Sequence, residues 1–150
     1  MRYLCSAISL AHYVVETCYT NGHPVSNLQL QKILYFLQTV YCRAKNGKEL
    51  LFCEEFQAWP YGPVLPNVYN EFSEYGGRII EKKYGEGAPC DSTAMIFINE
   101  GINVLSKKSP WDLVRLSHKK GMPWEQVYKD GKGYKQTIPN NLLIAAACEK

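Results

Sequence analysis

The sequence predicts a compact α+β domain that is mostly α-helical, with a small β-hairpin or a short antiparallel sheet. Several segments repeat apolar residues at three- and four-residue steps, which is the spacing of one face of an α-helix. Only the stretch around residues 50–59 contains short runs of β-favouring residues. A chain of 150 residues has the length of one domain, so we expect a single domain over residues 1–150.

The first two predicted helices supply much of the expected core. Apolar residues between positions 4 and 22 fall on one helical stripe, which predicts an amphipathic first helix. The second helix has a clear start, because Ser26 can cap it and Gln29 can close a capping box. It is expected to end near residues 45–47. Its wide apolar face predicts a central place in the core.

The predicted sheet is small. Residues 50–53 and 56–59 are two short β-favouring runs that suit a hairpin or an edge pair. The two prolines and the glycine within residues 59–63 predict a tight turn, which we expect to be stiff and exposed. A third short strand is expected within residues 78–82.

The remaining helices follow from apolar spacing and from capping signals. They are predicted over residues 66–76, 92–105, 109–121, 123–128 and 140–148. Proline near the start of several of these segments is compatible with a first helical turn, where its missing N–H is not needed.

Composition excludes several classes of protein. No apolar run approaches the ~20 residues that a membrane span needs, and no secretory signal is present, so we expect a cytoplasmic protein without membrane contact. The six cysteines have no Cys-x-x-Cys spacing, which argues against a zinc site and favours reduced thiols. Neither a metal nor a cofactor is expected.

An enzyme is not expected either. The histidines at positions 12, 23 and 118 do not sit in a catalytic signature. The chain also lacks a phosphate-binding glycine loop, a nucleophile elbow and a paired-histidine metal motif.

Two kinds of partner fit the composition. Residues 1–106 carry eight basic and ten acidic side chains, whereas residues 107–135 carry eight basic and three acidic ones, interleaved with aromatic residues. Such a region can bind nucleic acid. Tryptophan and tyrosine on the stiff backbone of residues 59–64 suit protein recognition, because they offer large contact area at low entropic cost. Composition alone fits equally well with Trp59 and Tyr61 covering the core beside the hairpin.

Three ordered segments resemble one known family. Residues 26–36 read SNLQLQKILYF, residues 56–69 read FQAWPYGPVLPNVY, and residues 111–118 read WDLVRLSH with Pro123-Trp124 after them. These segments are similar to the motifs of the Panacea domain, also called the SocA-like antitoxin domain, which is found in phage-associated GepA-type proteins. The Tyr-Gly-Pro-Val part is the most specific.

The resemblance implies a helical, non-catalytic domain encoded beside a toxin. Such antitoxins neutralise the toxin by direct binding or, as proteolytic adaptors, deliver it to a ClpXP-type protease. The alternative is a nucleic-acid-binding regulator of phage or mobile-element origin. The residues that the three segments make candidates for partner binding are Lys32, Tyr35, Trp59, Tyr61, Gly62, Pro63, His118 and Trp124.

Overall fold

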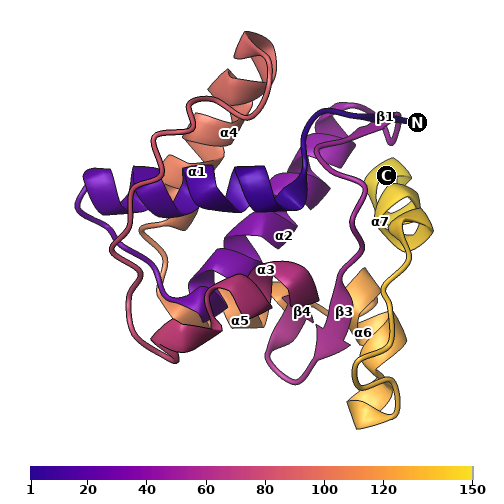
Figure 1. Ribbon diagram of the computed structural model, residues 1–150. Coiled ribbons are helices and arrows are strands. Elements are labelled where there is room, and N and C mark those ends of the chain that lie inside the picture. Colours follow the sequence, from indigo (N-terminus) through magenta and orange to yellow (C-terminus); the bar gives the residue numbers. More distant parts are fainter. Residues whose placement is uncertain (150) are drawn as a thin grey trace.

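The computed structural model describes residues 1–149 and shows seven α-helices and two small sheets in that part of the chain (Figure 1). The helices are α1 (Ala7–Thr20), α2 (Asn27–Ala44), α3 (Pro66–Glu71), α4 (Ser92–Leu105), α5 (Pro110–Ser117), α6 (Pro123–Tyr128) and α7 (Asn140–Cys148). The strands are β1 (Arg2–Tyr3), β2 (Glu49–Leu50), β3 (Gln57–Trp59) and β4 (Gly62–Val64). The predicted class, α+β and mostly α, is confirmed.

Helix α2 is the central element of the fold. It contacts α1, α4, α5, α7 and strand β4, and the other elements lie around it in Figure 1. Its apolar residues, such as Leu30, Ile33 and Leu34, are fully buried and belong to one continuous hydrophobic cluster. The predicted start is confirmed, because the Ser26 hydroxyl accepts a hydrogen bond from the Gln29 amide, and the Gln29 side chain accepts one from the Ser26 amide.

Replacing Ser26 by alanine is expected to lower the free energy of unfolding by about 1 kcal/mol, because the cap of α2 is lost. Ser26→Asn is the matched control, since asparagine can still accept the amide hydrogen bond. Urea denaturation of the three proteins measures the effect. Equal losses for both variants would show that the cap contributes nothing.

The N-terminal boundary differs from the prediction. Helix α1 begins at Ala7 rather than near position 4, with Ser6 as its N-cap. The amides of Leu4 and Cys5 instead donate to the carbonyl of Leu51, at 3.0 and 2.9 Å. The preceding residues form β1, which pairs in parallel with β2. This contact joins segments far apart in sequence, so local spacing could not reveal it.

The hairpin exists but uses different residues from those predicted. Strand β3 pairs in antiparallel fashion with β4, and residues 60–61 form the tip between them. The run at 50–53 is not its partner. On the other edge of β3, the amide of Ile138 donates to the carbonyl of Phe56 at 2.7 Å, and the amide of Ala58 donates to the carbonyl of Gln136 at 2.9 Å.

Three further predictions need correction. The expected strand at 78–82 is reduced to one bridge, between Ile79 and Ser26. Helix α3 ends at Glu71 and is followed by a 3-10 turn, rather than continuing to residue 76. Helix α5 ends at Ser117 instead of reaching Gly121, because the amide of His118 closes the last turn onto carbonyls of the helix.

Gly101 lies inside α4 for a reason of packing. A Cβ atom at this position would lie 2.5 Å from the Cδ2 atom of Leu37. A larger residue here would therefore require the Leu37 side chain to shift, so glycine leaves room for Leu37 between α4 and α2.

Candidate partner-binding site

The hairpin of β3 and β4 rests directly on α2 and α5. The ammonium group of Lys32 on α2 is fully buried and donates a hydrogen bond of 2.9 Å to the carbonyl of Pro63. Gly62 has φ +112°, and a Cβ atom there would lie 2.5 Å from the Ser117 hydroxyl and 2.6 Å from Cε of Lys32. Only glycine fits between the hairpin and the two helices.

Two further polar residues of α2 hold the chain that follows the hairpin. The Gln31 side chain accepts a hydrogen bond of 2.8 Å from the Leu65 amide and donates one of 3.0 Å to Asn27. Asn27 in turn donates to the carbonyl of Tyr69 at 3.1 Å. Both side chains are buried. The candidate list omitted them, although both lie in the first motif and their spacing of four residues places them on one helix face.

The burial of Lys32 changes its acid–base chemistry. Removal from water lowers the pKa of Lys32 to about 7. Burial also lowers the pKa of His118, and the positive charge of Lys32 lowers it further. Neither group forms an ion pair with a carboxylate among residues 1–149.

A stack of aromatic rings supports the hairpin from the other side. The rings of His118 and Trp124 are parallel, with centroids 3.7 Å apart, and the ring of Tyr128 stacks on Trp124 at 4.6 Å. The indole N–H of Trp124 donates a hydrogen bond of 2.8 Å to the carbonyl of Trp59. This stack ties α5 and α6 to β3.

The prediction that the whole turn is exposed is wrong. Gly62, Pro63 and the following valine are buried, because the backbone there forms β4 and packs on α2. Pro60 and Tyr61, at the tip of the hairpin, remain exposed. Tyr61 has 57% of its surface exposed, and its ring lies 5.6 Å from that of Trp111, which is 54% exposed. We call Tyr61 and Trp111 the aromatic pair. Trp111 was not among the candidates, although it begins the third motif.

Comparison with known proteins identifies the family. The family model described as "Antitoxin SocA-like, Panacea domain" matches residues 30–125. The chain belongs to the SocA-like Panacea-domain family of antitoxins. It is 33% identical over 138 residues to "Antitoxin SocA" of Caulobacter vibrioides (strain NA1000 / CB15N), which covers 85% of this chain and 72% of that protein. No solved structure matches the chain.

The eight candidate residues of this Panacea domain come together in space, but most of them are inside. Lys32, Tyr35 and Trp124 are buried, and Trp59 and His118 are partly buried. Tyr35 packs its ring edge-to-face on Phe56 at 5.3 Å. The most specific Panacea motif thus forms a rigid support for one exposed tyrosine.

Three other features considered in the sequence are the basic region, a metal site and a membrane span. The basic side chains of residues 107–135 are exposed, as are Trp111 and Tyr134, whereas Trp124 is buried in its stack. Over residues 1–149 there is no grouping of three His, Cys, Asp or Glu side chains suited to a metal ion. Within the same residues, every helix is too short or too polar to cross a membrane.

Proposed function

We propose that this SocA-like chain is a cytoplasmic, non-catalytic antitoxin that binds a cognate toxin protein encoded beside it. Membership of the antitoxin family carries this proposal. Its partner-binding surface is centred on the aromatic pair. Exposed tyrosine and tryptophan on a rigid backbone are the side chains most often responsible for binding energy at protein interfaces.

The candidate residues then divide into two groups by position. Tyr61 and the half-buried Trp59 contact the toxin, together with Trp111. The buried members hold these rings in place and include Lys32, Tyr35, Gly62, Pro63, His118 and Trp124. A rigid contact loop lowers the entropic cost of binding, because its conformation is fixed before the toxin arrives.

Binding can neutralise the toxin in two ways, which co-expression distinguishes. The toxin gene is expressed with and without this chain in cells that have or lack a ClpXP-type protease. A direct inhibitor protects both strains and leaves the toxin level unchanged, whereas an adaptor protects only the strain with the protease and lowers the toxin level. A neighbouring gene product that is harmless alone, or that remains toxic beside this chain, would refute the antitoxin role.

Tyr61→Ala is expected to weaken toxin binding about tenfold, because it removes one of the two exposed rings of the aromatic pair. Tyr3→Ala is the matched control, since Tyr3 is 47% exposed but lies on β1, away from the hairpin. Isothermal titration with the purified toxin measures both dissociation constants. Unchanged binding by the Tyr61 variant would remove the aromatic pair from the interface.

A further inference from the structure

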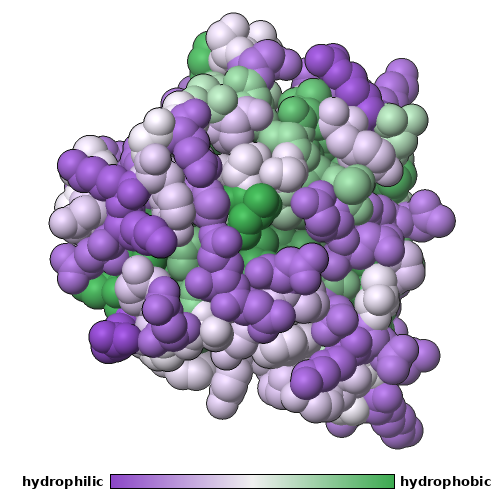
Figure 2. Space-filling view, viewed as in Figure 1, coloured by the Kyte–Doolittle hydropathy of each residue, from purple (hydrophilic) through white to green (hydrophobic). Residues whose placement is uncertain are grey.

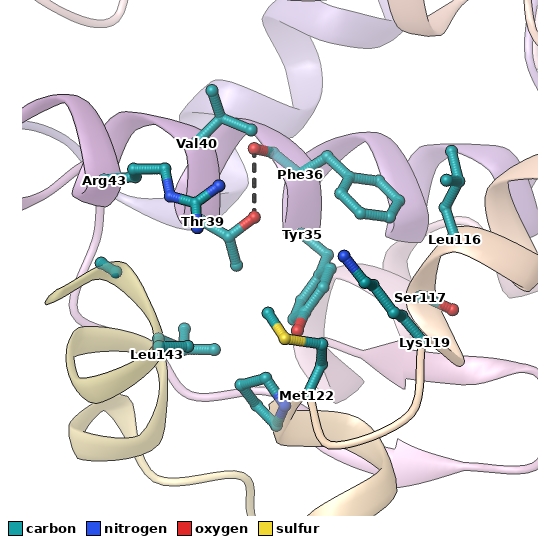
Figure 3. Close-up of a pocket in the computed structure, with 13 residues that line it drawn as sticks. Tyr35, Phe36, Thr39, Val40, Arg43, Leu116, Ser117, Lys119, Met122 and Leu143 are labelled. Atoms are coloured by element: carbon teal, nitrogen blue, oxygen red, sulfur yellow. Dashed lines mark hydrogen bonds between the residues drawn. The ribbon is translucent and has the colours of Figure 1, made fainter. Parts of the chain in front are cut away.

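An apolar groove runs along the outer side of α2. It consists of two adjoining hollows that share Phe36, Val40 and Leu116. The first, of about 210 Å³, lies between α2, α7 and the segment joining α5 to α6. Figure 3 shows Leu143 and Met122 on opposite walls of it, with Tyr35 pointing inward from α2. The second, of about 320 Å³, lies between α2 and α4.

The groove is apolar surface that the described chain leaves uncovered. Val40, Leu116 and Val104 are large apolar side chains exposed along it. Continuous apolar patches are uncommon on the surfaces of monomeric proteins, and those that occur often mark binding sites. The face seen in Figure 2, with α1 and α3 in front, carries hydrophilic side chains around hydrophobic areas near the centre and the upper right of the view.

The charges at the groove indicate the chemistry of its occupant. Arg43 and Lys119 line the first hollow from opposite sides, as Figure 3 shows, and no carboxylate lines it. Both cations are exposed and neither forms an ion pair within residues 1–149. The only charged residue lining the second hollow is Glu100. The complementary surface is therefore apolar, with acidic residues at the Arg43 and Lys119 end.

The walls of the groove also restrict the backbone of its occupant. They are mainly helices, whose backbone hydrogen bonds are internal, so they offer no free strand edge to an extended chain. An α-helix suits such walls because its backbone groups are hydrogen-bonded to one another and need no partner from the groove. Its apolar residues at three- and four-residue steps then reach both hollows.

We propose that the α2 groove binds an amphipathic helix of the toxin, whose apolar face fills the two hollows and whose acidic residues pair with Arg43 and Lys119. This inference rests on the proposed antitoxin function. It extends the interface beyond the aromatic pair, since α5 carries Trp111 at one end and Leu116 of the groove at the other.

The test uses a matched pair of variants on α4. Val104→Glu places a carboxylate in the second hollow, whereas Ile96→Glu changes a residue of the same helix that is 64% exposed and lines neither hollow. With the purified toxin from the neighbouring gene, Val104→Glu is expected to raise the dissociation constant at least about tenfold. Ile96→Glu should stay within about twofold of the unmodified chain. Circular dichroism melting confirms that both variants are folded.

A second set of variants tests the proposed ion pairs between acidic residues of the toxin and Arg43 and Lys119. Charge reversal of Arg43 and Lys119 to glutamate is expected to weaken binding about tenfold and to reduce its salt dependence, because two ion pairs become repulsive. Reversal of Lys48 and Lys120, which line neither hollow, is the control. A photoreactive residue at Val40 should crosslink to an amphipathic, acid-bearing segment of the toxin.

The outcomes separate the two proposals. If the unmodified chain forms no complex with the toxin, the proposed function fails and the groove inference fails with it. If the complex forms and Val104→Glu binds as tightly as Ile96→Glu, only the groove inference is overturned. It is also overturned if the chain alone is a dimer that Val104→Glu dissociates without affecting toxin binding, because the occupant is then a second copy.

Discussion

Gly62→Ala is expected to lower the free energy of unfolding by about 2–4 kcal/mol, through backbone strain and overpacking together. The φ angle of +112° is one that side chains with a Cβ atom rarely adopt. The added methyl group would also lie 2.5 Å from the Ser117 hydroxyl and 2.6 Å from Cε of Lys32. Since both neighbours are buried, neither can move aside without disturbing the contact between β4 and α2.

Gly22→Ala is the control that separates the effect of backbone strain from the effect of overpacking. Gly22 also has a positive φ, of +80°, but a Cβ atom there would have nothing within 4 Å. Alanine at this position is expected to cost only the backbone strain, about 1 kcal/mol. Chemical denaturation of both variants measures the difference. If the two losses are equal, the close approach at Gly62 is not the source of its requirement for glycine.

Stability is expected to depend on pH through Lys32. Burial lowers the pKa of Lys32 from 10.5 to about 7, so between these values the unfolded chain binds a proton that the folded chain does not. The free energy of unfolding therefore rises with pH across this window and falls as the pH drops toward 7. Between pH 7.5 and 10, the contribution of Lys32 to stability should increase by about 2–3 kcal/mol.

Comparison with Lys32→Met isolates this effect, because methionine fills similar space without a titrating group. Tyrosine and cysteine titrations are shared by both proteins, so they largely cancel in the difference. The variant also leaves the Pro63 carbonyl without its donor, which lowers stability by a similar amount at every pH. Denaturation curves at several pH values give the result. A constant difference between the two proteins would mean that Lys32 stays protonated in the folded chain.

Local signals in the sequence determined which segments are helical, although the ends of α1, α3 and α5 differ from the prediction. Ser26 and Gln29 form the expected capping box because all its partners lie within one helical turn. The three motifs also identified residues that lie close together in the fold, since Lys32, Gly62 and Trp124 all meet around the hairpin. What these residues do there was not predictable, because a lysine in a helix pattern is ordinarily exposed.

Tertiary structure decided strand pairing and burial. Residues 49–50 pair with the N-terminal strand rather than with β3, a choice that depends on which segments α2 brings side by side. Lys32 is buried because the hairpin packs over it, and the carbonyl of Pro63, 31 positions away, accepts its hydrogen bond. The sequence by itself thus determined which segments are helical, the family, and several of the residues that gather at the hairpin. It did not indicate Asn27, Gln31 or Trp111. Only the tertiary structure decided that Gly62 and Pro63 are buried while Tyr61 stays exposed, and that the groove beside α2 lies open, because burial depends on contacts between distant segments that no local pattern encodes.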